Sequence, residues 1–145
     1  MDRVARKRWL EHSQTVLRGA GLRASAGRTA VVELLARQSC LLSAQDISDR
    51  LRAEGSRGST ATVYRALETL HELGLVRRFD SGEGVARYEP VDPSGDHHHH
   101  IVIEGSGDVL PFEDAELERA IEGLGERLGM AVTSHDVILR ARRRS

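Results

Sequence analysis

The stretch SAQDISDRLRAEGSRGSTATVYRALETLHELG, residues 43–74, decides the fold. Ser43 is followed three residues later by Asp46, the arrangement of a capping box at a helix start, and Gly55 ends that helix. Ser59 can cap a second helix, which runs up to Gly74. Its apolar residues recur at helical spacing: Val63, Leu67, Leu70 and Leu73. The short connection between the two helices predicts a helix-turn-helix pair.

The periodicity changes after this pair. Residues 75–79 and 85–89 have the composition of strands, and the Gly-rich residues 80–84 between them predict a β-hairpin. A hairpin directly after a helix-turn-helix is a wing. Upstream, residues 2–21 predict an exposed basic helix, and Ser25 caps another helix that ends near Gln38. We therefore expect a winged helix-turn-helix domain over residues 1–90.

The remaining residues predict a second, smaller domain. Residues 91–95 form a hinge or linker, because prolines and a glycine cluster there. In residues 96–145 we expect strands at 97–104, 109–112 and 131–140 and a helix at 114–128, followed by a disordered arginine tail at 142–144. The chain is thus expected to be α+β, with an N-terminal winged helix and a small α/β domain.

Charge divides the chain in the same way. The net charge of the 145 residues is -1, but residues 1–79 hold 14 Lys or Arg against 8 acids, and residues 80–145 hold 7 against 14. A basic half joined to an acidic half favours nucleic-acid binding by the first domain. The lone cysteine, Cys40, excludes an internal disulfide and a four-cysteine zinc site. Without an apolar run or a signal peptide, we expect no membrane association and a cytoplasmic location.

The second helix of the pair is the expected recognition helix, because that helix enters the major groove. Arg65 can bond a guanine edge and Tyr64 can contact a thymine methyl group. The hydroxyls that can bond phosphates belong to Ser59, Thr60 and Thr62. Further backbone or minor-groove contacts are expected from Arg23, Arg28 and Arg57. The alternative is an ordinary solvated helix start.

Four consecutive histidines, residues 97–100, predict metal binding, since neutral imidazole is a common metal ligand. A purification tag and a solvated loop are the alternatives. On a strand the side chains alternate between faces, so His97 and His99 would serve one site and His98 and His100 another. Each pair needs further ligands.

Four residues are candidates to complete the two sites. Glu118 lies at the edge of the apolar stripe of helix 114–128, and His135 alternates with apolar residues on the last predicted strand, so both can join His97 and His99. Glu89, before the linker, can join His98 and His100, with Cys40 as a tentative further ligand. The alternatives are a core histidine for His135, a surface carboxylate for Glu89 and a small buried thiol for Cys40.

Together these residues resemble the ferric uptake regulator family of bacterial metal-sensing repressors, over about residues 19–140. The matching segments are residues 21–23, 43–44, 61–65, 74–76 and 87–89 and the histidine run. The resemblance implies a homodimer that pairs through its C-terminal domains. It also implies binding to double-stranded DNA at a palindromic, AT-rich operator when a divalent metal is bound, with Fe2+ first and Zn2+ or Mn2+ as alternatives. A peroxide-responsive member is a further alternative.

The resemblance also assigns roles to residues. Tyr64 and Arg65 match the base-contacting pair, and Arg23 matches a minor-groove residue. The residues that match the interdomain sensory site are Glu89, His98 and His100. Those that match a second site, inside the dimerisation domain, are His97, His99, Glu118 and His135.

Three departures from the family pattern affect these assignments. The CxxC positions of a structural zinc site hold Ile103 and Ser106, so no such zinc is expected. Leu41 stands where the sensory site has a histidine, and Pro111 replaces a supporting glutamate. The sensory site is therefore short of a ligand, and Cys40 or water fills the gap or sensing is weaker.

Two functions of other classes compete with a metal-responsive repressor. A metallohydrolase would use the histidines and Glu118, but the chain has no HExxH spacing, and we expect no enzyme activity. A metal-buffering protein would need no sequence-specific DNA binding. Metal-dependent binding to an operator is expected of the repressor, and not of the metallohydrolase or the metal buffer.

Overall fold

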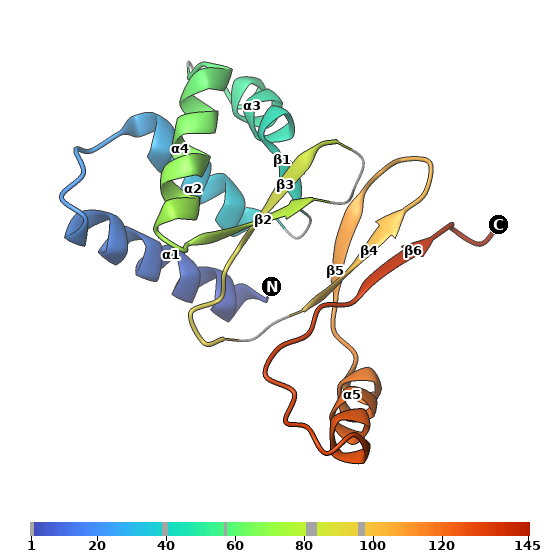
Figure 1. The fold of residues 1–145 in the computed structure, drawn as a ribbon. Coiled ribbons are helices and arrows are strands. Elements are labelled where there is room, and N and C mark those ends of the chain that lie inside the picture. The colour runs from blue at the N-terminus through green and yellow to red at the C-terminus, as the bar shows by residue number, and fades with distance from the viewer. Residues whose placement is uncertain (1, 39–40, 57, 81–83, 96–97) are drawn as a thin grey trace. The chain divides into compact units, whose positions relative to one another are not determined.

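The computed structural model describes residues 2–38, 41–56, 58–80, 84–95 and 98–145. They form two compact units, Met1–Asp96 and His97–Ser145 (Figure 1). Each unit is described by itself below.

Four helices build the first unit: α1 (Arg3–Gly19), α2 (Ala26–Arg37), α3 (Ala44–Ala53) and α4 (Thr60–Glu72). The predicted caps are confirmed. The Ser25 hydroxyl accepts the N–H of Arg28, and Ser59 does the same for Thr62. Ser43 and Asp46 form the complete capping box of α3, each side chain bonding the other residue's backbone N–H. These local bonds fix where both helices of the helix-turn-helix begin.

The predicted wing is present as strands β2 (Val76–Asp80) and β3 (Ala86–Pro90), which pair antiparallel. A third strand was not predicted: β1 (Leu42–Ser43) pairs with β3, giving the sheet order β1-β3-β2. Two residues are too few to show a period in the sequence. The centre of the predicted turn, residues 81–83, lies outside the described residues.

The prediction of an exposed basic helix over residues 2–21 was wrong in one respect. Trp9 on α1 is completely buried among the core residues of the first unit, and its indole Nε1 donates to the backbone oxygen of Leu75 at 2.8 Å. Helix α1 is therefore anchored to the residue just before the wing. Its charged face is solvent-exposed, and Val4 on it is 67% exposed.

The second unit is a three-stranded sheet with one helix. Its strands are β4 (His99–Ile103), β5 (Val109–Phe112) and β6 (Ile138–Ala141), in the order β5-β4-β6, and its helix is α5 (Ala115–Arg127). Strand β4 pairs antiparallel with β5 and parallel with β6. The helix and β5 were predicted. Asp114 caps α5 by accepting the N–H of Leu117.

Two predicted strands were too long. The last strand begins at Ile138 and not at residue 131. Just before it, the backbone N–H of Val137 donates to the His99 ring, while its carbonyl accepts the backbone N–H of His100 on β4. The histidine strand begins at His99, so His98 lies just before it, and His97 lies outside the described residues. Arg142, expected in a disordered tail, donates to Glu104 at 2.5 Å.

The second unit contains little apolar core. Among its described residues, Val102 and Val109 are the buried hydrophobic side chains. None of the described helices combines the length and the apolar character that crossing a membrane requires.

The Trp9 anchor is testable by substitution. Trp9→Phe removes the bond to Leu75 and part of the buried ring, so we expect the free energy of unfolding to fall by about 1–3 kcal/mol. Urea denaturation followed by far-UV circular dichroism measures the change, with Val4→Ala on the exposed face of α1 as the control. Equal stability of the two variants would contradict the anchoring role.

Candidate metal centre and DNA-reading surface

Three side chains of the second unit converge on one point. The carboxylate of Glu118 on α5 lies between two imidazoles: His99 Nε2 is 2.5 Å from Oε1, and His135 Nε2 is 2.9 Å from Oε2. The ring centroids of His99 and His135 are 5.1 Å apart. His99 is 1% exposed, whereas Glu118 and His135 are partly exposed. The cluster thus joins β4, α5 and the segment before β6.

The backbone fixes the proton of His99. The N–H of Val137 points at His99 Nδ1 at 3.2 Å, so Nδ1 must accept and the ring proton is on Nε2. Nε2 therefore donates to Glu118. The hydrogen bond from His99 lowers the pKa of the Glu118 carboxyl, and His135 lowers this pKa further, against the opposing effect of burial. Glu118 consequently remains ionised at a lower pH than an ordinary glutamate.

The donor set suits a divalent transition metal. One potential ligand atom from each of His99, Glu118 and His135 lies within 4.8 Å of the others, and two nitrogens with one oxygen match Fe2+, Mn2+ or Zn2+. A metal at His99 Nε2 would replace the proton now donated to Glu118, so binding would release a proton. The ring centroid of Phe112 lies 5.6 Å from that of His99. The sequence did not predict this neighbour of the cluster, because an apolar residue on a strand does not indicate a metal site.

The other predicted ligands are placed as follows. His98 and His100 have ring centroids 5.4 Å apart in the second unit. Glu89 lies on β3 of the first unit, opposite Arg77, and Cys40 and His97 lie outside the described residues. The sensory set of Glu89, His98 and His100 therefore stays a prediction. Pro111 on β5 pairs with His100 in the sheet and supplies no ligand atom.

The start of α4 carries the predicted DNA-contacting residues. Tyr64 is 54% exposed, and Arg65 is exposed beside it. The hydroxyl of Thr62 lies 3.1 Å from that of Ser59 and accepts from Arg65 Nη2 at 3.5 Å. The hydroxyl of Thr60 instead bonds buried Ser48 at 3.0 Å, which links α4 to α3.

The basic residues outside α4 are also located. Arg23, before α2, is exposed, and its carbonyl accepts from Arg28 Nη2 at 2.6 Å. Arg57 lies outside the described residues.

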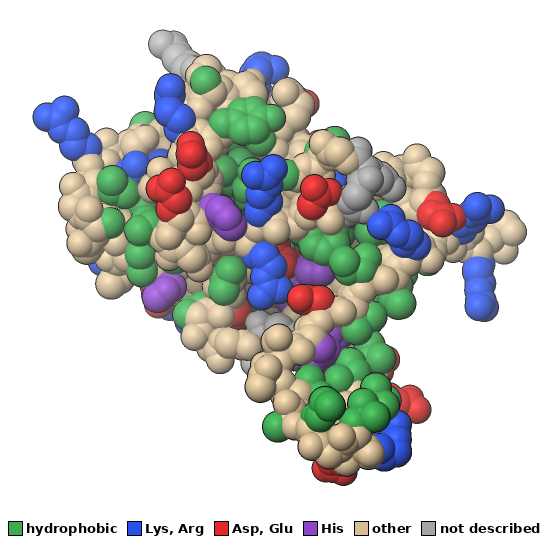
Figure 2. Space-filling view, viewed as in Figure 1, with side chains coloured by type: hydrophobic (Ala, Val, Ile, Leu, Met, Phe, Trp, Pro, Cys, Tyr) green, Lys and Arg blue, Asp and Glu red, His purple; other side chains and the backbone are tan. Residues whose placement is uncertain are grey.

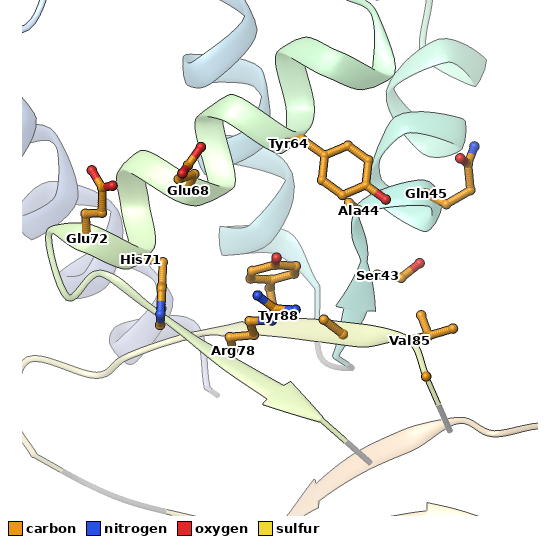
Figure 3. A pocket seen from close by; sticks show the side chains of 12 residues that line it. Ser43, Ala44, Gln45, Tyr64, Glu68, His71, Glu72, Arg78, Val85 and Tyr88 are labelled. Carbon is orange, nitrogen blue, oxygen red and sulfur yellow. The ribbon is translucent and has the colours of Figure 1, made fainter. Parts of the chain in front are cut away.

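A pocket of about 670 Å³ is lined by residues of α4, of the wing strands and of the start of α3 (Figure 3). Tyr64 lies at its α3 side, and Glu68 and Glu72 lie along α4 toward its other end (Figure 3). Carboxylates repel DNA phosphates. Glu68 and Glu72 therefore disfavour DNA contact by the later turns of α4.

A winged helix-turn-helix followed by a small α/β domain with a histidine–carboxylate cluster defines a class, the metal-responsive transcription regulators. The ferric uptake regulator family model matches residues 19–140. The ferric uptake regulation protein of Pseudomonas aeruginosa is 33% identical over 129 residues, which cover 88% of this chain and 95% of that one.

Solved structures of ferric uptake regulators are also similar to this chain. The Helicobacter pylori ferric uptake regulator has 25% identity and a TM-score of 0.80, covering 95% of this chain and 91% of its own. The Pseudomonas aeruginosa ferric uptake regulator with manganese has 29% identity and a TM-score of 0.69, covering 91% and 98%. The chain belongs to the ferric uptake regulator family. Members of this family are metal-responsive transcription regulators and not enzymes.

The cluster makes a direct prediction. Glu118→Gln removes the carboxylate that both imidazoles face, so we expect the affinity of this site for Zn2+ or Mn2+ to fall by at least about ten-fold. Chelator competition measures the change. Glu116→Gln, an exposed neighbour on the first turn of α5, is the control. Unchanged affinity in Glu118→Gln would rule out this cluster as a metal centre.

Proposed function

We propose that this chain is a homodimeric repressor of metal homeostasis that binds a palindromic operator when a divalent metal is bound, and that the metal is Fe2+ in the cell. The observation that carries the proposal is the convergence of His99, Glu118 and His135 in a chain that also contains a winged helix. An enzyme would not need the winged helix, and a metal buffer would need only the metal-binding cluster.

The choice of iron rests on similarity and on ligand chemistry. The relatives matched above are named ferric uptake regulation proteins. One of the similar structures holds manganese, which keeps Mn2+ as an alternative. Nitrogen and oxygen donors without a thiolate bind Fe2+, Mn2+ and Zn2+ alike, so the ligands alone do not select among them. A peroxide-responsive role would use the same iron and histidines.

Two metal sites have different roles in this proposal. His99, Glu118 and His135, with His97, form the site within the dimerisation domain. Glu89, His98 and His100, with Cys40 as a tentative ligand, form the sensory site that joins the wing strand β3 to that domain. A metal there would supply the positive charge that holds these ligands together. Suppose that without metal the protein favours the arrangement that does not bind the operator by 99 to 1. To reverse that ratio, the metal must bind the operator-binding arrangement more tightly by about 5.5 kcal/mol.

The DNA contacts follow from the exposed start of α4. Tyr64 and Arg65 reach base edges in the major groove, and Arg23 reaches the minor groove. Ser59 and Thr62 are the proposed phosphate-binding hydroxyls, and Thr60 joins them only through the part of its hydroxyl's bonding capacity that Ser48 leaves. Arg65 is partly oriented before DNA binding, because its guanidinium Nη2 donates to the hydroxyl of Thr62.

The dimer is supported by exposed apolar side chains in the second unit. Figure 2 shows hydrophobic side chains gathered on the part of this unit that carries α5. The large ones that are at least 45% exposed are Leu124, Leu128, Met130, Val132, Ile138 and Leu139. A unit with only a small core of its own and such a surface is stabilised when a second copy covers it.

The division of labour between the domains is testable with DNA. Arg65→Ala should weaken binding to a selected operator about 5- to 150-fold, since a bidentate base contact contributes about 1–3 kcal/mol, while metal stoichiometry stays the same. His98→Ala with His100→Ala should abolish the metal response of binding. The assay is gel retardation with a duplex selected from random DNA by the Mn2+-loaded protein.

Two controls accompany this assay. Arg119→Ala on α5 removes one positive charge outside the DNA surface and should leave affinity nearly unchanged. Wild-type binding should weaken when a chelator removes the metal, because the proposed function makes operator binding depend on a bound metal. If Arg65→Ala lost metal and the histidine variant lost only specificity, the assignment of roles would be wrong.

The dimer surface has its own test. Leu124→Glu with Leu128→Glu places two carboxylates in the apolar surface, so we expect the dimer to dissociate into monomers in sedimentation velocity at micromolar concentration. Glu122→Gln, on the same helix, is the control. A dimer that survives both glutamates would place the interface elsewhere.

A further inference from the structure

Gly27 lies on the first turn of α2, and glycine is in general a weaker helix former than alanine. The space for a side chain here is limited. A Cβ atom at Gly27 would overlap the Cγ2 methyl group of Thr62 on α4 and would lie 3.9 Å from the Cβ of Thr62. Helix α2 packs against α4, and Gly27 is where the Thr62 methyl rests on it. By contrast, Gly19 at the end of α1 has no atom within 4 Å of its Cβ position.

The position of the Thr62 methyl also determines the position of its hydroxyl. The two groups branch from the same carbon, so rotation about χ1 moves both together. With the methyl against Gly27, Oγ1 lies 3.1 Å from Ser59 Oγ and accepts from Arg65 Nη2 at 3.5 Å. The helix cap, the Thr62 hydroxyl and the Arg65 guanidinium are thus connected in one short chain of polar contacts.

We infer that Gly27 is a positioning residue for DNA recognition, which acts through Thr62 to orient Arg65. A side chain at residue 27 has two ways to fit. Either Thr62 rotates and its hydroxyl leaves Ser59 and Arg65, or α4 moves away from α2. Both change the geometry of the surface that reads DNA without altering a residue that touches DNA. The inference rests on the proposed function of α4 as the recognition helix.

The test is a double-substitution cycle measured on the full-length, Mn2+-loaded protein. Gly27→Ala should weaken binding to the selected operator duplex at least about five-fold, while binding to random duplex DNA changes less. Thr62→Ser removes the methyl and keeps the hydroxyl. Gly27→Ala should therefore have a clearly smaller effect in the Thr62→Ser background than in the wild type.

Gly19→Ala is the matched control, because it makes the same change in a helix with open space around it. A second readout is independent of DNA: a nuclear Overhauser contact between the Thr62 methyl and the Gly27 α-protons, lost in Gly27→Ala. Far-UV circular dichroism shows that each variant is folded.

The outcomes separate this inference from the proposed function. Absence of sequence-selective binding by the wild type would overturn the proposed function, whatever Gly27 does. Wild-type binding with an unaffected Gly27→Ala variant, or an equal loss in both backgrounds of the cycle, would overturn the positioning role alone. A missing Thr62–Gly27 contact would do the same.

Discussion

The carboxylate of Glu118, held between the imidazoles of His99 and His135, is the interaction on which the second unit depends. This unit buries few apolar side chains, so packing alone contributes little to its stability. The cluster connects β4, α5 and the segment before β6, three parts that are far apart in the sequence. A metal bound there, as proposed, would add stability, because it would bind the folded arrangement and not the unfolded chain.

Strand β4 carries residues of both proposed metal sites. His99 takes part in the cluster, while its strand neighbour His100 contacts His98 and belongs to the proposed sensory set. Because side chains alternate between the faces of a strand, β4 could serve both proposed sites. In the first unit, one side chain likewise makes two kinds of contact. Thr62 caps no helix itself, yet its methyl rests on α2 and its hydroxyl connects Ser59 with Arg65.

Local signals were sufficient for most helices, and non-local contacts account for what the sequence did not predict. The capping box of Ser43 and the cap at Ser59 are bonds between residues three apart, so the sequence shows them directly. The burial of Trp9 depends on a carbonyl 66 residues away. The last strand was predicted too long because alternation continued through residues 131–137, whereas strand pairing begins at Ile138 and the N–H of Val137 donates to the His99 ring. Glu118 and His135 were predicted as partners of His99, but the proton position on His99 required the backbone geometry.

Amide hydrogen exchange with and without Mn2+ tests the central claim most directly. If Glu118, His99 and His135 hold a metal that stabilises the second unit, saturating Mn2+ should slow exchange in β4 and β6 strongly, while peptides covering Trp9 and α2 change little. Exchange in β4 and β6 that is the same with and without the metal would contradict the account.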